Sequence, residues 1–211
     1  MKALRGLLGA GLLATTILAA TPATASEAIP TPPGHRLHDF DGERSDVAFE
    51  LRVLLRHLRG RFLSLRGSLL VDEARQHADI DVSLDSNSVW MAKESNAEYA
   101  RSGEFFDAER FPHIRFHASD VPMTLFRQGG AMSGEVELRG IRRSMTLDVE
   151  PANCERPGID CDVSASGAVD RSEFGMTSKT FFVGKQVELF FRIRLRDVPE
   201  EPGSNDSGTG T

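Results

Sequence analysis

The stretch Val187–Arg196, which reads VELFFRIRLR, alternates apolar and polar side chains. Every second residue from Val187 to Leu195 is apolar. Glu188, Arg192 and Arg194 fall between them and Arg196 follows, whereas Phe190 is out of phase. Successive side chains of a β-strand point to opposite faces, so this period predicts a strand with one dry and one wet face.

The same period recurs along most of the chain, with turn residues between the segments. Short alternating strands of this kind are typical of an antiparallel sandwich or barrel. The sequence predicts eight clear strands, and 121–127 is a ninth, doubtful one. The clear strands fall at residues 47–53, 63–71, 78–84, 114–118, 132–138, 145–149, 163–169 and 187–195.

Two interruptions of the alternation predict short helices. Ser95 and Glu98 have the spacing of a capping box, so we expect a helix over about 96–102, with Gly103 in a left-handed position at its end. The segment from Asp170 to Glu173 repeats the cap pattern and predicts a second short helical turn.

The two ends of the chain differ from its middle. Residues 1–25 combine a basic start, a short apolar run and a small-residue cleavage site, which predicts a cleaved secretory signal and export to the periplasm or beyond. We expect a Pro-rich flexible leader over residues 26–34, a single folded domain over 35–197 and a disordered acidic tail over 198–211.

The charge balance excludes some classes of partner. Cleavage of the signal removes two cations and no acids, so the formal net charge goes from -6 to -8. Nucleic-acid binding rests largely on cationic contacts to phosphate, and the balance argues against it. It argues equally against electrostatic adhesion to an anionic membrane.

The only cysteines are Cys154 and Cys161, with Pro157 and Gly158 between them. In an oxidising compartment this spacing predicts a disulfide that closes a turn, whereas two free thiols are the alternative. The spacing is no metal or redox signature.

Three sets of polar side chains are candidates for chemistry. Two histidines on one strand lie roughly 13 Å apart, too far for one metal ion. The run of aspartates is typical of a solvated strand face, although paired acids can also do acid–base work. The arginine hairpin is typical of an exposed turn, although arginines can also hold an anionic head group. We therefore expect no metal, no cofactor and no catalytic machinery. The sets are His113 and His117; Asp79, Asp81 and Asp85; and Arg139, Arg142 and Arg143.

Several segments resemble the conserved blocks of YceI-like proteins, in the same order along the chain. Together they span about Val47 to Leu195, nearly all of the domain. The segments are 59–62 (RGRF), 101–107 (RSGEFFD), 111–116 (FPHIRF), 134–141 (GEVELRGI), 145–149 (MTLDV), 169–176 (VDRSEFGM) and 183–189 (VGKQVEL).

The resemblance implies an all-β, eight-stranded, antiparallel lipocalin-like β-barrel with one or two short helices near its ends. It also implies an exported protein that holds a polyisoprenoid or similar long-chain amphiphile in an apolar lumen. Tyr99, Phe105 and Phe106 are then expected to shape the portal, with Phe174 and Met176 in another part of the wall. The remaining ligand-binding candidates are Phe49, Leu51, Leu65, Val82, Phe116, Val136, Leu138, Leu189 and Phe191.

The pattern alone leaves open whether such a barrel is hollow. Small residues on the dry faces would leave volume unfilled, or would relieve crowding in a solid core; they are Gly67, Ala78, Ala118, Gly134, Ala165 and Gly167. The alternative function is therefore a structural or interaction protein with a solid core. Its outer patch would use Phe181, Phe182 and Phe190, and the oligomeric state stays open between monomer and dimer.

Overall fold

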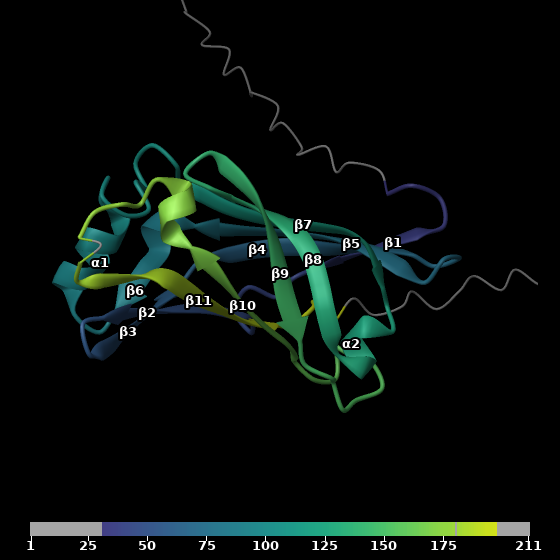
Figure 1. Ribbon diagram of the computed structural model, residues 1–211. Helices are drawn as coiled ribbons and strands as arrows, with labels where there is room; N and C mark the ends of the chain where they lie inside the picture. The colour runs from purple at the N-terminus through teal and green to yellow at the C-terminus, as the bar shows by residue number, and fades with distance from the viewer. Residues whose placement is uncertain (1–30, 180, 198–211) are drawn as a thin grey trace, which may run out of the picture. The chain divides into compact units, whose positions relative to one another are not determined.

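The alternating stretch near the C-terminus forms β11 (Val183–Ile193), one of eleven strands of a single sheet (Figure 1). The computed structural model describes residues 31–179 and 181–197. The signal, most of the leader and the acidic tail lie outside the described residues.

The described residues form mostly strands, with two short α-helices and two 3-10 turns. The strands are β1 (His35–Asp39), β2 (Asp46–Val53), β3 (Arg56–Phe62), β4 (Leu65–Asp72), β5 (His77–Asp85), β6 (Val89–Met91), β7 (His113–Pro122), β8 (Gly130–Leu138), β9 (Ile141–Val149), β10 (Val163–Asp170) and β11. The helical elements are α1 (Glu94–Arg101), α2 (Leu125–Gln128), η1 (Ser86–Ser88) and η2 (Arg171–Phe174).

All strand pairings between these elements are antiparallel, in the order β1-β4-β5-β7-β8-β9-β10-β11-β2-β3-β6. The first and last parts of the domain also meet, because the Asp41 amide donates to the Arg194 carbonyl at 2.8 Å and the Arg196 amide to the Asp39 carbonyl at 2.9 Å. The sheet therefore curls round an interior, and the predicted antiparallel barrel is confirmed.

The strand count differs from the prediction because two of the barrel's positions are each occupied by two consecutive strands. β1 and β2 together occupy one position of the barrel, and β3 and β4 together occupy the next. β1 pairs with β4, and β2 pairs with β3. When each of these two pairs is counted as one position, the barrel has the expected eight positions. β6 is an additional short strand that pairs with β3. The alternation did not predict β1, β3 or β6.

The prediction of a doubtful strand over 121–127 holds for residues 121 and 122, which end β7, and is wrong for the rest. β7 ends at Pro122, which has no amide hydrogen to donate to a ladder. The chain then turns into α2, whose Phe126 is buried.

The first helix is present, but its predicted start and end are wrong. α1 begins at Glu94 after Lys93, so Ser95 lies inside the helix and makes no capping box. Ser102 follows the helix in an extended conformation, and Gly103 has no positive φ. The second turn is confirmed, since the Asp170 side chain accepts a hydrogen bond from the Ser172 amide at the start of η2.

No helix among the described residues is long and apolar enough to cross a membrane.

Candidate functional site

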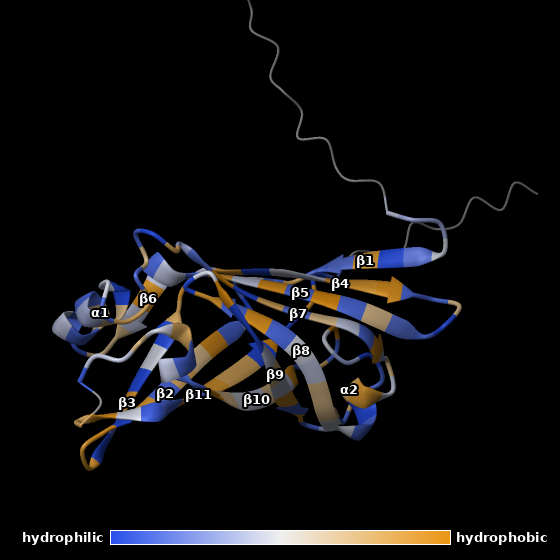
Figure 2. Ribbon diagram, turned by 45° about the horizontal axis from the view of Figure 1, so that its top comes forward, coloured by the Kyte–Doolittle hydropathy of each residue, from blue (hydrophilic) through white to orange (hydrophobic). Residues whose placement is uncertain are grey.

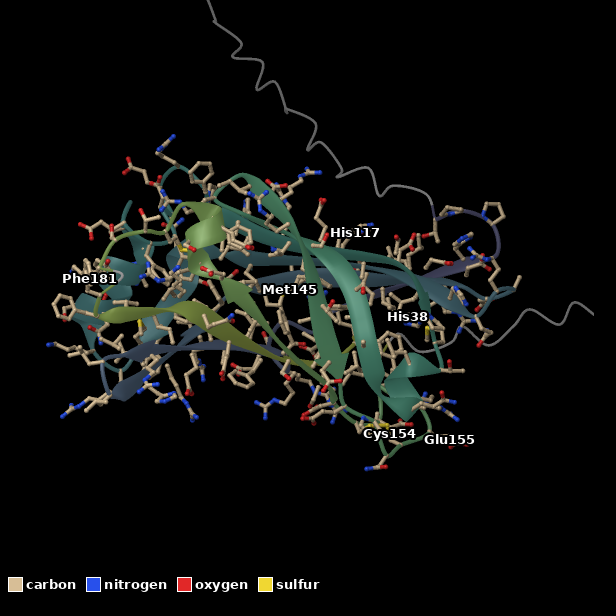
Figure 3. The ribbon with its side chains drawn as sticks, in the orientation of Figure 1. His38, His117, Met145, Cys154, Glu155 and Phe181 are labelled. Atoms are coloured by element: carbon tan, nitrogen blue, oxygen red, sulfur yellow. A yellow bond between two sulfur atoms is a disulfide. The ribbon has the colours of Figure 1, made fainter. Side chains whose placement is uncertain are left out.

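The barrel contains a cavity of about 570 Å³ at the end that carries α2 and the disulfide loop. Of its twenty-five lining residues, nineteen are apolar, and the six polar ones are His38, Gln76, Thr124, Arg127, Glu155 and Arg156. His38 and Glu155 lie at this end in Figure 3, far from Phe181 at the other. A largely apolar cavity of this size is typical of a small-molecule site.

Two pairs of facing residues form the floor of the cavity. Val82 on β5 pairs with Phe116 on β7, and Ala165 on β10 pairs with Phe191 on β11. All four line the cavity, whereas Leu84, Ile114, Gly167 and Leu189, the next inward positions on these strands, do not. The hollow therefore extends about halfway along the barrel.

A cluster of aromatic rings fills the other half. Phe49, Phe62 and Phe106 are in mutual contact, with ring centroids 5.5 to 5.6 Å apart, and Phe105 lies 4.7 Å from Phe106 in an edge-to-face arrangement. All four are buried. Such pairs add about 0.5–1.5 kcal/mol each beyond the burial of their area, so this end is stable and solid.

The glycines on the inward faces do not create the cavity, contrary to the argument from small residues. A Cβ on Gly67 would lie 2.5 Å from the Phe40 ring, and one on Gly134 would lie 2.5 Å from the Phe116 ring. A Cβ on Gly167 would meet Leu147 at 2.8 Å. The side chains that line the cavity thus occupy the space in front of these glycines. Of the six small residues, Ala165 lines the cavity.

The disulfide loop and α2 form the rim on one side. Cys154 and Cys161 are bonded, as predicted, and the loop between them contributes Glu155 to Ile159 to the lining. The loop is tied to the segment just after β11 by the Leu195 amide, which donates to the Gly158 carbonyl at 2.9 Å. It is tied to α2 by Arg127, which donates to the Glu155 carbonyl.

The polar groups of the rim include both charged and neutral side chains. Arg156 is paired with Asp160 at 2.7 Å. Burial lowers the pKa of His38 below its ordinary value of 6.5, Arg36 lowers it further, and Glu73 opposes them. His38 is therefore neutral near pH 7 and presents one donor and one acceptor.

Three of the fourteen predicted ligand-binding residues line this cavity: Val82, Phe116 and Phe191. The other eleven lie outside its wall, and most belong to the solid half. Phe105 and Phe106 are buried in the aromatic cluster, and burial also raises the pKa of Tyr99. The eleven are Phe49, Leu51, Leu65, Tyr99, Phe105, Phe106, Val136, Leu138, Phe174, Met176 and Leu189.

Most of the cavity wall was not predicted from the sequence. Leu69, Ile80 and Leu147 were on dry strand faces, but the alternation cannot tell which end of a dry face borders a hollow. His38 lies in β1, a strand that the alternation did not predict. Phe126 lies in the segment predicted as a doubtful strand, where no helical signal pointed to it.

Four of the five histidines and aspartates singled out on the strands have structural partners on the outer surface. His117 contacts Asp81 at 2.9 Å, Asp79 accepts from the Asp120 amide, and Asp85 caps η1. Within residues 31–179 and 181–197 no group of three His, Cys, Asp or Glu side chains could hold a metal ion.

The arginine hairpin lies outside the cavity wall. Arg139 donates to the carbonyls of Gly103 and Phe105 and is mostly buried, so the expected exposed turn is wrong at this residue. Arg142 pairs with Glu135 and Glu137 on β8, and the exposed Arg143 donates to the carbonyl of Arg142.

Comparison with known proteins agrees with this fold. The family described as YceI-like domain matches residues 38–195. The chain is 25% identical to the UPF0312 protein YE1254 of Yersinia enterocolitica over 160 residues, covering 74% of this chain and 82% of the relative. It is 25% identical to Protein YceI of Salmonella arizonae over 166 residues, covering 74% and 83%.

Two solved structures have similar folds. BcnA of Burkholderia cenocepacia matches with a TM-score of 0.60 at 18% identity, covering 73% of this chain and 98% of that one. A polyisoprenoid binding domain from Saccharophagus degradans, implicated in plant cell wall breakdown, matches with a TM-score of 0.55 at 13% identity, covering 74% and 95%.

Proposed function

Since this chain belongs to the YceI-like family, we propose that it is an exported lipid-binding protein that holds a polyisoprenoid or a similar long-chain amphiphile in its barrel. The observation that carries the proposal is the apolar cavity of about 570 Å³, which has a closed aromatic floor and a polar rim. The structurally similar domain of Saccharophagus degradans is a polyisoprenoid binding domain, which supports the ligand class.

The dimensions of the cavity favour a single chain that enters tail first. A water-sized group takes roughly 30 Å³ in a liquid, so the cavity accommodates at most on the order of 20 chain carbons. The floor at Phe116 and Ala165 stops the chain halfway along the barrel. A longer polyisoprenoid would leave its head-group end outside the rim.

The energetics require a long apolar chain. Burial of about ten methylene groups contributes about 8 kcal/mol, at 0.8 kcal/mol each. Loss of translational and rotational freedom costs about 4–15 kcal/mol, so short chains would bind weakly and long ones tightly.

The rim suits the polar end of an amphiphile. His38, Gln76, Arg127 and Glu155 supply donors and acceptors there, while every lining residue at the floor is apolar. A ligand with one hydroxyl or acidic group would place it at the rim and its chain below. We assign no catalytic role to this arrangement.

The test is to identify what the purified protein carries. Native mass spectrometry and organic extraction of the wild type should yield a long-chain lipid. Ala165→Phe, which places a ring on the floor, should lose most of it. Ala168→Phe is the matched control, because Ala168 is exposed on the same strand. A wild type without bound lipid that also fails to bind an added polyprenol or fatty acid would refute the proposal.

Export is tested separately, because the predicted signal lies outside the described residues. N-terminal sequencing of the protein from the periplasmic fraction should begin at about Ser26. Recovery of the full-length chain in the cytoplasm would contradict export and leave the lipid-binding test unaffected.

A further inference from the structure

The end of the barrel opposite the cavity carries four exposed apolar side chains on two loops, here called the apolar tip. Leu54 and Leu55 lie in the turn between β2 and β3, and Phe181 and Phe182 lie in the loop before β11. Their exposed fractions are 61%, 88%, 94% and 58%. Figure 2 shows the β2–β3 turn as a hydrophobic loop at the extremity of the barrel, and Phe181 stands at the same extremity in Figure 3.

The two loops form one surface, although they are far apart in the sequence. The Leu54 amide donates to the Phe182 carbonyl at 2.8 Å, and Val53 pairs with Val183 next to it. These backbone contacts hold the two loops side by side and bring the four side chains to one surface.

Folding alone does not account for this surface. Leu54 has a φ of 54°, the left-handed region that favours glycine or asparagine, and its side chain is exposed. Leucine there costs stability without contributing to the core. Strained positions that persist are characteristic of functional surfaces.

A buried arginine holds the second loop in place. Arg171 is 1% exposed and donates to the carbonyls of Met176, Ser178, Val183 and Gly184. Along the sequence, two of these carbonyls come before Phe181 and Phe182 and two come after them. Arg171 thus holds the backbone before and after the two phenylalanines.

The segments that form the tip are locally cationic, in contrast to the whole chain. Residues 51–62 and 174–187 contain no Asp or Glu, while the chain has a net charge of -6. Glu50, just before the first segment, is paired with Arg59 and His57, and Lys179 lies 4.2 Å from the ring of Tyr99. The cations of the two segments are Arg52, Arg56, Arg59, Arg61, Lys179 and Lys185.

We propose that the apolar tip docks on an anionic phospholipid bilayer, inserting its two leucines and two phenylalanines between lipid head groups. Exposed apolar side chains surrounded by cations are the pattern of peripheral membrane binding. The whole-chain charge argued against such adhesion, but exposed charges act over a Debye length of about 8 Å at physiological salt, so the cations of the two segments count for more than distant acids. Because the cavity opens at the other end, the docked protein holds its mouth away from the bilayer. This inference does not rest on the proposed ligand.

The experiment is flotation of the full-length protein with two kinds of vesicle, phosphatidylcholine alone and phosphatidylcholine with phosphatidylglycerol. The wild type should float with the anionic vesicles, and added salt should weaken binding. L55S/F181S should lose at least tenfold in vesicle affinity. The matched control is L37S/F190S, which removes apolar side chains that are 45% and 41% exposed away from the tip, and it should bind like the wild type.

Charge-reversal variants separate the electrostatic contribution to vesicle binding from the contribution of the apolar side chains. R56E/K185E should bind anionic vesicles at least tenfold more weakly, whereas R143E, at an exposed arginine on β9, should not change binding. All altered residues are exposed, and thermal unfolding of each variant checks that it is folded.

Two outcomes would overturn the proposal. One is a wild type that floats with neither vesicle. The other is a concentration-dependent dimer that L55S/F181S abolishes without any vesicle binding, which would assign the tip to a second copy of the chain.

Discussion

The packing of Phe116 against Gly134 makes a strong prediction for the variant Gly134→Ala. The added Cβ would lie 2.5 Å from the Phe116 ring and 2.5 Å from the His117 carbonyl oxygen, whereas ordinary contacts begin at 3.4 Å. The ring and strand β7 must therefore shift by roughly 1 Å in a close-packed interior. Since Phe116 lies between Gly134 and the cavity, the shift pushes the ring into the space that the ligand would occupy.

Overpacking of this kind destabilises by about 1–3 kcal/mol. Alanine also restricts the unfolded chain, which offsets about 0.4–1 kcal/mol. Gly103→Ala is the matched control, because its Cβ would meet only the Asp107 carboxylate oxygen, at 3.8 Å. The difference between the two variants isolates the steric contribution. In a domain of this size it corresponds to a gap in Tm of about 2–12 °C.

The assay is thermal unfolding followed by circular dichroism, with lipid content measured by native mass spectrometry. Gly134→Ala should unfold earlier than Gly103→Ala and carry less lipid. Equal Tm values and equal lipid content in the two variants would refute the account of Phe116 as a ring that fills the glycine's space and forms the cavity floor.

The remaining predictions concern the rim and the buried arginine. Cys154→Ser/Cys161→Ser should lose about 2.5 kcal/mol of stability in urea unfolding. It should also release lipid faster, because the loop forms the rim of the cavity; an unchanged rate of release would show that the loop does not help to retain the ligand. The pKa of His38 is lowered on folding, so the unfolded chain takes up the proton first. Stability should then fall as pH drops from about 6.5 through the folded-state pKa, and His38→Gln should flatten that slope below about pH 6.5; an unchanged slope would rule out His38 as its source. Arg171→Met should cost about 3 kcal/mol or more, since two buried and two partly buried carbonyls lose a charged donor, whereas the exposed Arg143→Met should stay within about 0.5 kcal/mol; equal stability of the two would contradict the role of Arg171.

Local chemistry in the sequence predicted those elements that depend on near neighbours. The alternation in 163–169 and 187–195 identified β10 and β11 and their inward faces, because the period of two is a property of one strand. Asp170 marked η2, since its cap bond reaches only two residues along the chain. Cys154 and Cys161 pair across a short loop, and the sequence sufficed for that too.

Where local signals competed with tertiary contacts, the prediction failed. Ser95 and Glu98 have the form of a capping box, yet α1 begins before both of them, at Glu94, and packs beside β6. The segment 121–127 is apolar enough for a strand, but Pro122 ends β7 and the buried Phe126 belongs to a helix over the cavity.

The alternation therefore determined that the chain makes an antiparallel sandwich or barrel, and which side chains of the predicted strands face inward, and the resemblance to the YceI-like family selected the barrel. Only the tertiary structure decided which end of the barrel is hollow. The reason is that inward direction is set residue by residue, whereas empty volume depends on side chains from distant strands sharing one space. Phe116 fills the gap at Gly134 and Phe40 fills the gap at Gly67, while Phe49, Phe62 and Phe106 meet from three separate segments to close the other end.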